Sequence, residues 1–176
     1  MIPWIRLDAV QLEDGVELRL MQRGAEFSIM LGSNELMNSR LSGSEEALAS
    51  LACERLGGRP KARMLIGGLG MGFTLRAALG GLGAGAQVTV AELVPHVVAW
   101  ARGPMAEVFG GCLEDPRVHV HLGDVGELIR EENGAWDAIL LDVDNGPEGL
   151  TRQGNDALYS AAGLAAANQE IGRAHV

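Results

Sequence analysis

Cysteine and basic residues are both scarce in this sequence. Only Cys53 and Cys112 occur among its 176 residues, too few for a disulfide framework or a cysteine metal cage, so we expect both to be buried free thiols. Lys and Arg total 14 against 23 Asp and Glu, which gives a formal net charge of −9. This balance argues against non-specific binding to nucleic acid, which depends on neutralising phosphates, but it would suit a cationic substrate.

Long hydrophobic runs are missing as well. No apolar stretch approaches the roughly 20 residues of a membrane-spanning helix. The first residues lack the cationic and then apolar pattern of a signal peptide. We therefore expect a cytoplasmic protein with neither membrane nor nucleic-acid partners. Hydrophobic residues make up 47% of the chain, which is enough for the core of one full domain with a small appendage.

The pattern of polar and apolar residues divides the chain into zones. It first alternates with period two, which predicts short antiparallel strands. A helix with an apolar face follows, with Ser44 as its expected cap and a glycine pair at Gly57 as its end. After Pro60, strands and helices alternate. We predict an N-terminal β region at 1–42, a connecting helix and linker at 43–60, an α/β domain at 61–169 and a tail at 170–176.

The α/β domain is predicted to be a parallel sheet with helices on both faces. Its strands are almost continuously apolar, and such strands need cover on each side. The expected strands are Arg63–Ile66, Gln87–Leu93, Arg117–Leu122 and Trp136–Val143, and the expected helices are Phe73–Leu79, Pro95–Val108, Val125–Arg130 and Asp156–Ala167.

A glycine-rich turn follows the first of these strands. Gly68, Gly70 and Gly72 form a G-x-G-x-G run, which lets the backbone approach a ligand closely and aims free N–H groups at it. Glu92 ends the next strand, 20 residues after Gly72, and an acidic residue at about this offset contacts the ribose in nucleotide-binding βαβ units. The turn could also be a plain tight turn. With Glu92, it predicts a site for a nucleoside-containing cofactor.

Acidic residues end the later strands too. Asp124 follows the third strand, and Asp142 and Asp144 follow the fourth. The carboxyl ends of parallel strands meet at one edge of the sheet, where ligands bind. Any one of these carboxylates could be solvated or could cap the next helix. Together they predict one acidic pocket.

Four motifs follow one another along the chain: GGLGMG, VTVAEL, DPRVHVHLGD and WDAILLDVDNGP. In this order they resemble those of the spermidine synthase family, aminopropyltransferases built on the Rossmann-like fold of S-adenosylmethionine-dependent methyltransferases. The resemblance implies that Glu92 holds the ribose hydroxyls, that Asp124 contacts the adenine amine and that Asp142 faces the reacting centre. The implied cofactor-binding residues are Gly68, Gly70, Gly72, Glu92, Leu93, Asp124, Val125 and Asp142, and the implied catalytic residues are Asp142 and Asp144.

The chain departs from that family at three places. The glycine loop carries Leu69 and Met71 where the family usually has an acidic residue that helps to bind the aminopropyl donor. Asn145 stands at the second aspartate position of a D-x-x-D motif, so Asp144 would have to serve as the base. A Tyr-His pair of the family is replaced by Ser44 and Glu45.

Three functions are therefore open. The chain could transfer an aminopropyl group from decarboxylated S-adenosylmethionine to an amine, or a methyl group from S-adenosylmethionine to an unknown substrate. It could also be a non-catalytic nucleoside-binding module. A dinucleotide oxidoreductase is disfavoured because the loop lacks a further glycine three residues on. The expected partners are a small-molecule amine or other small acceptor, with a homodimer left open.

Two further features bear on the prediction. His119 and His121 lie on one face of a predicted strand, but no third ligand is suitably spaced, so we predict no metal site.

One back-translation of the last residues, EIGRAHV, resembles a short-read sequencing adapter. We interpret 170–176 as a non-native tail and the gene as truncated, which resequencing tests: a natural stop codon after Val176 would contradict it.

Overall fold

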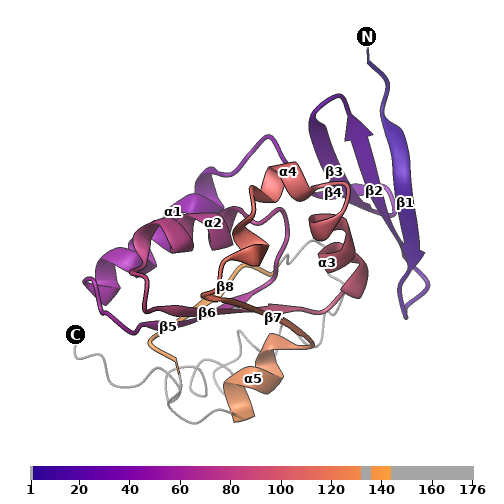
Figure 1. The fold of residues 1–176 in the computed structure, drawn as a ribbon. Helices are drawn as coiled ribbons and strands as arrows, with labels where there is room; N and C mark the ends of the chain where they lie inside the picture. The colour runs from indigo at the N-terminus through magenta and orange to yellow at the C-terminus, as the bar shows by residue number, and fades with distance from the viewer. Residues whose placement is uncertain (1, 132–135, 144–176) are drawn as a thin grey trace.

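The N-terminal region forms an antiparallel sheet in the computed structural model, which describes residues 2–131 and 136–143 (Figure 1). Alternate residues of the inner strands are buried, among them Leu18, Leu20 and Ile29, as the period-two pattern predicts. The strands, in spatial order, are β1 (Ile5–Gln11), β2 (Glu17–Arg23), β3 (Glu26–Leu31) and β4 (Asn34–Asn38).

The second sheet is parallel and has the spatial order β7-β6-β5-β8. Its strands are β5 (Arg63–Gly67), β6 (Gln87–Glu92), β7 (Val118–Leu122) and β8 (Ala138–Leu141). The order reverses at β5, because β6 and β7 extend the sheet on one side and β8 lies on the other. In open α/β sheets a ligand binds at the carboxyl ends of the strands beside such a reversal, here between β5 and β8.

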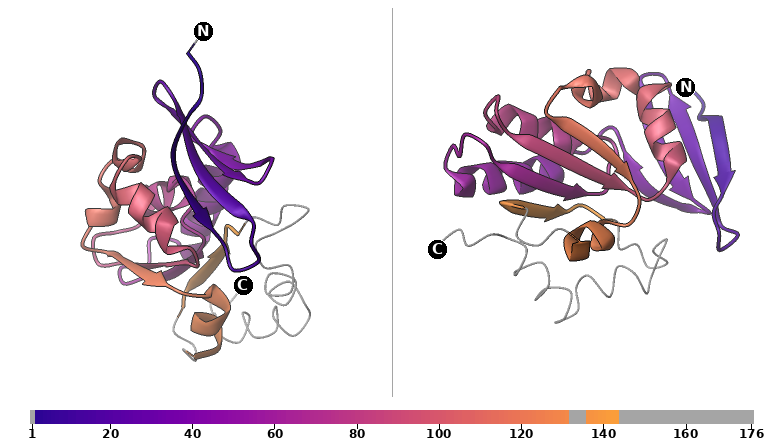
Figure 2. Two further views of the ribbon diagram at one scale, coloured as in Figure 1. Left: turned by 90° about the vertical axis from the view of Figure 1, so that its right-hand side faces the viewer. Right: turned by 60° about the horizontal axis from the view of Figure 1, so that its bottom comes forward.

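Helices cover both faces of the parallel sheet (Figures 1 and 2). The larger core continues from Met64 and Val90 of the parallel sheet into Leu20 and Ile29 of the antiparallel one. A smaller core on the other face contains Trp136. The predicted α/β fold with an antiparallel N-terminal region is confirmed. One face carries α1 (Gly43–Leu56), α2 (Phe73–Gly81), α3 (Pro95–Arg102), α4 (Ala106–Phe109) and the 3-10 turn η1 (Cys112–Glu114), and the other carries α5 (Val125–Glu131).

The helix expected over 95–108 is interrupted, so that prediction is wrong in part. Pro95 begins α3 as expected, but α3 ends at Arg102 and α4 begins only at Ala106. Pro104 lies in the break, and proline disfavours helical backbone at the residue before it. Between the two helices the N–H of Met105 donates to the carbonyl of Trp100 at 2.9 Å.

Smaller differences concern element ends. Ser44 is not the cap of α1, because the helix begins at Gly43, after Ser42, and the Ser44 hydroxyl donates to Oε2 of Glu45 at 2.7 Å. β8 is shorter than the expected strand at both ends. The helix expected over 156–167, the tail at 170–176, Asp144 and Asn145 lie outside the described residues. Within the described ranges, no helix is long and apolar enough to cross a membrane.

The DPRV segment at the start of β7 has a structural role. Nη1 of Arg117 donates to the carbonyls of Leu79 and Leu82 at 3.1 and 2.9 Å, at the end of α2. Nε and Nη2 donate to both carboxylate oxygens of Asp115, and these bonds lower the pKa of Asp115 to about 2. The motif therefore joins the end of α2 to the beginning of β7. The carboxyl end of β7 lies at the same edge of the sheet as the carboxyl ends of β5 and β6.

Candidate active site

The glycine loop between β5 and α2 has a conformation that glycine alone adopts readily. Gly68, Gly70 and Gly72 have φ angles of +93°, +51° and +80°. A Cβ on Gly68 would lie 2.2 Å from the backbone oxygen of Asp142, and one on Gly72 would lie 2.5 Å from the Phe109 ring. These glycines therefore bring the loop against the end of β8 and against α4, so the protein's own packing requires them.

Replacing Gly68 by alanine is expected to lower the free energy of unfolding by about 3 kcal/mol or more, because strain and a backbone clash act together. Gly80→Ala is the matched control, since Gly80 lies in α2 with no atom within 4 Å of its added Cβ. The control should be neutral or stabilising. Urea denaturation of both variants measures the difference, and equal stabilities would contradict the loop geometry.

Glu92 lies beneath the loop, at the end of β6. Its carboxylate accepts the N–H of Leu69 at 3.0 Å and the N–H of Val94 at 2.9 Å, and the residue is 8% exposed. Burial raises the pKa of Glu92, and the backbone bonds oppose that shift. Glu92 is therefore not a solvated carboxylate at the edge of the sheet, because it is buried and holds the backbone of the glycine loop.

The Glu92 carboxylate retains hydrogen-bonding capacity. A carboxylate offers about four lone-pair sites, so its bonds to Leu69 and Val94 leave capacity for hydroxyl donors. Leu93 follows it and is 49% exposed, an unusual position for a large apolar side chain at the end of a buried strand. Leu122 is paired with Glu92 across β6 and β7 and is 54% exposed. Leu122 was not among the predicted cofactor residues, although its place before Gly123-Asp124 pointed to the same edge.

The next two predicted cofactor residues differ in their surroundings. Oδ1 of Asp124 accepts the N–H of Gly126 at 2.7 Å, so Asp124 caps α5. Its other oxygen has no hydrogen bond among the described residues. Val125 is 5% exposed and belongs to the core under α5, beside Gly67. Its side chain is therefore part of that core, and the cofactor roles of Asp124 and Val125 stay predictions.

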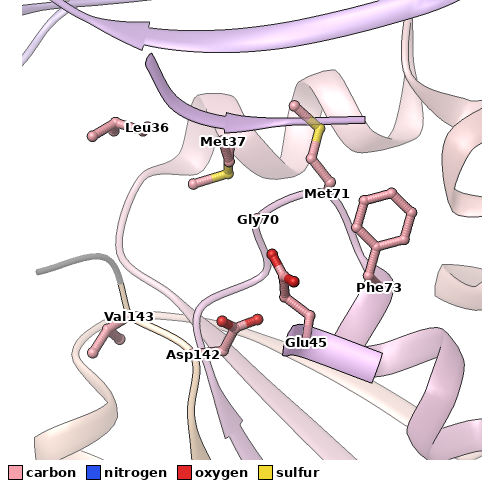
Figure 3. A pocket seen from close by; sticks show the side chains of 8 residues that line it. All are labelled: Leu36, Met37, Glu45, Gly70, Met71, Phe73, Asp142 and Val143. Carbon is pink, nitrogen blue, oxygen red and sulfur yellow. The ribbon is translucent and has the colours of Figure 1, made fainter. Parts of the chain in front are cut away.

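A cavity of about 230 Å³ opens beside the glycine loop, at the reversal point between β5 and β8 (Figure 3). The Thr74 hydroxyl, in the first turn of α2, donates to Oδ2 of Asp142 at 2.6 Å and orients that carboxylate. The predicted Gly70 and Asp142 are thus brought together, and Glu45 joins them from α1. The lining residues are Leu36, Met37, Glu45, Gly70, Met71, Phe73, Asp142 and Val143.

Sequence reasoning did not assign Glu45, Met37 or Thr74 to the site. Glu45 appeared only as a departure from a family pattern, and no residue of the N-terminal β region was assigned to the site. β4 nevertheless reaches the loop, where the Met37 sulfur lies 3.3 Å from the Cβ position of Gly70. Of the other candidates, His119 is exposed on β7, and no group of at least three potential metal ligands is found in 2–131 and 136–143.

Comparison with known proteins points to one family. The chain is 35% identical over 95 residues to a polyamine aminopropyltransferase of a Synechococcus species, and 32% identical over 84 residues to one of Sulfolobus acidocaldarius. These matches cover 52% and 48% of the chain. The resemblance to the spermidine synthase family is confirmed.

The fold agrees with this resemblance. A crystal structure of spermidine synthase in complex with the transition-state analogue AdoDATO superimposes with a TM-score of 0.76 at 18% identity, over 94% of the chain. At this identity the superposition shows a similar fold and nothing more. The matches cover only 30% and 27% of the two aminopropyltransferases, and 54% of the spermidine synthase chain. No family model matches the chain.

Proposed function

We propose that this chain is the donor-binding part of an aminopropyltransferase that uses decarboxylated S-adenosylmethionine and an amine acceptor. The observation that carries the proposal is the cavity beside the glycine loop, where Asp142 and Glu45 supply negative charge beside apolar side chains such as those of Met37 and Phe73. Both substrates are cations, so such a cavity fits them. The resemblance to polyamine aminopropyltransferases supports the same reaction.

The nucleoside half of the donor would lie along the ends of β5, β6 and β7. Glu92 would accept bonds from the ribose hydroxyls, and charge-assisted bonds of this kind contribute roughly 1.5–3 kcal/mol each. Leu93 and Leu122 are the exposed apolar side chains at this edge, and they would pack against the adenine ring. The second oxygen of Asp124 would accept a bond from the adenine amine.

The transfer itself needs little beyond placement and a base. A carboxylate first takes a proton from the reacting ammonium group of the acceptor, because only the neutral amine has a lone pair with which to attack. The amine nitrogen then attacks the propyl carbon that is bonded to the sulfonium sulfur. A carbon–nitrogen bond forms, the carbon–sulfur bond breaks, and its electron pair stays on sulfur, which leaves neutral 5′-methylthioadenosine and a secondary ammonium product. Asp142, oriented by Thr74, faces the cavity in which this occurs.

Calorimetry on the full-length protein tests the proposal. Decarboxylated S-adenosylmethionine and 5′-methylthioadenosine should bind, and S-adenosylmethionine should bind at least about tenfold more weakly because its carboxylate meets a negative cavity. Incubation with a diamine should then release 5′-methylthioadenosine. Preferential binding of S-adenosylmethionine would favour a methyltransferase instead. Absence of binding by every one of these compounds would refute a nucleoside site.

A further inference from the structure

A charged side chain lies on the inner face of the antiparallel sheet. Asp8 of β1 is opposite Leu20 of β2, which is fully buried, because the register of the two strands shifts between Arg6 and Asp8. Residues directly opposite each other in an antiparallel pair share a face of the sheet. A register shift of this kind changes the direction of a side chain. The shift therefore turns the Asp8 carboxylate toward the α/β domain.

Trp100 of α3 is the hydrogen-bond partner of this carboxylate. Its indole Nε1–H donates to Oδ2 of Asp8 at 2.7 Å, and the residue is 3% exposed. This bond is the largest of the contributions that lower the pKa of Asp8, ahead of the N–H of Ala9 and nearby His96, so the carboxylate stays ionised at neutral pH. A charge-assisted bond thus joins β1 to a helix of the α/β domain, 92 residues along the chain (Figure 1).

The opposite edge of the same sheet lines the cavity. Met37 belongs to β4, and its sulfur lies 3.3 Å from the Cβ position of Gly70 in the glycine loop (Figure 3). The sheet therefore contacts the α/β domain at both of its edge strands, β1 at α3 and β4 at the loop. Between these contacts its inner face packs into the larger core, which both domains share. Because the four strands are hydrogen-bonded to one another, a displacement of β1 also displaces β4.

We infer that the Asp8–Trp100 bond holds the antiparallel sheet over the cavity and so fixes the wall that Met37 contributes. Trp100 lies outside the residues that line the cavity, so it is a positioning residue. Without the bond, the sheet would move more freely against the glycine loop. Groups bound in the cavity would then lose part of their contacts. A nucleoside along the ends of β5, β6 and β7 would keep its own, an expectation that rests on the proposed function.

A contact that merely stabilises the fold is the competing explanation, and Trp136 supplies a matched control for it. Trp136 is also 3% exposed, but its Nε1 has no hydrogen-bond partner in 2–131 and 136–143. It belongs to the smaller core, on the other face of the parallel sheet. Replacement by phenylalanine removes the same volume at either position, but at Trp100 it also removes the bond to Asp8. Trp136→Phe therefore measures the effect of the lost volume alone.

Hydrogen exchange, measured by mass spectrometry on the full-length protein, tests whether the bond holds the sheet. Trp100→Phe should speed exchange in β1 and β4 about tenfold and change exchange in β5 and β6 less than about twofold, because local opening leaves the parallel sheet folded. Trp136→Phe should leave β1 and β4 unchanged. Asp8→Ala should reproduce Trp100→Phe, and the double variant should show no further increase, because both substitutions remove the same bond.

Substrate measurements on the same variants test the consequence for the cavity. Trp100→Phe should raise the KM for a diamine about fivefold and change the affinity for 5′-methylthioadenosine less than about twofold. Asp8→Asn should lie closer to the wild type than Asp8→Ala does, because its amide oxygen still accepts the indole N–H. Trp136→Phe should match the wild type in both quantities.

Three results would overturn the inference. Exchange in β1 and β4 could be the same in Trp100→Phe and Trp136→Phe, or both sheets could exchange faster to the same extent, which would indicate a general loss of stability. The affinity for 5′-methylthioadenosine could also fall as much as that for the diamine, which would place the effect at α3 and the end of β6. A wild type that binds no nucleoside would refute the proposed function, and the exchange comparison would still decide whether the bond holds the sheet.

Discussion

Replacing Glu92 by alanine is expected to weaken 5′-methylthioadenosine binding by on the order of a hundredfold and to lower the free energy of unfolding by about 1–3 kcal/mol. The loss of affinity follows from removing charge-assisted bonds to the ribose hydroxyls. The loss of stability follows from the contacts of Glu92 with the N–H groups of Leu69 and Val94, which would lose their buried acceptor. Calorimetry and urea denaturation measure the two effects separately.

Two further variants sharpen this test. Glu92→Gln retains the shape and one acceptor oxygen, so it should weaken binding only about tenfold. Glu54→Ala removes an exposed carboxylate from α1 and should change neither quantity. Equal nucleoside affinity in the wild type and Glu92→Ala would contradict the ribose assignment. A loss of stability without a loss of affinity would indicate that Glu92 supports the glycine loop and does not bind the nucleoside.

The raised pKa of Glu92 adds a dependence on pH. Burial shifts this pKa above its ordinary value of 4.5, so the folded protein takes up the proton at a higher pH than the unfolded chain does. The stability contributed by this group is therefore fully present below 4.5 and is lost as the pH rises through the folded-state pKa. Nucleoside affinity should change in the opposite direction, because the ionised carboxylate is the better acceptor. It should fall on acidification through that pKa, and Glu92→Gln should remove this dependence.

The strands and the glycine loop could be predicted from sequence because their signals are local. Apolar runs of strand length ending in glycine or acid specify β5 to β8 within a few residues of the observed bounds. The break at Pro104 was equally local and was overlooked. Trp100, Met105 and Phe109 are all buried, and the turn after α3 separates the first of them from the other two.

Only those residues of the candidate site that lie at the end of a strand could be predicted from the sequence. The spacing between Gly72 and Glu92 placed the carboxylate at the right strand end, but spacing cannot tell a rim carboxylate from one that binds the loop amides. Glu45 enters the cavity because α1 packs against α2, and Met37 because β4 reaches the loop. Both placements depend on contacts between segments distant in sequence, which no local pattern encodes.

The second large effect concerns the base. Asp142→Asn is expected to lower kcat for aminopropyl transfer by about 10²–10⁴-fold while the affinity for 5′-methylthioadenosine changes little, because an amide cannot take the proton from the attacking amine. Asp142 is the aspartate whose side chain the structure places in the cavity, whereas Asp144 lies outside the described residues. Single-turnover rates and calorimetry on the same preparations separate the two quantities.

Variants of Thr74 and Asp144 provide the comparison that shows which residue is the general base. Thr74→Val removes the hydroxyl that donates to Asp142 at 2.6 Å, so it should slow transfer about tenfold without abolishing it, and Thr74→Ser should restore the rate. If Asp144→Asn abolishes transfer and Asp142→Asn leaves kcat intact, Asp144 is the base and the assignment to Asp142 is wrong. If both variants lose transfer, pH–rate profiles of their residual activity identify the base. The variant that lacks the base also loses the acidic limb of the profile, because that limb reports the ionisation of the base. A positioning residue lowers the rate without removing that limb, which is the behaviour expected of Thr74→Val.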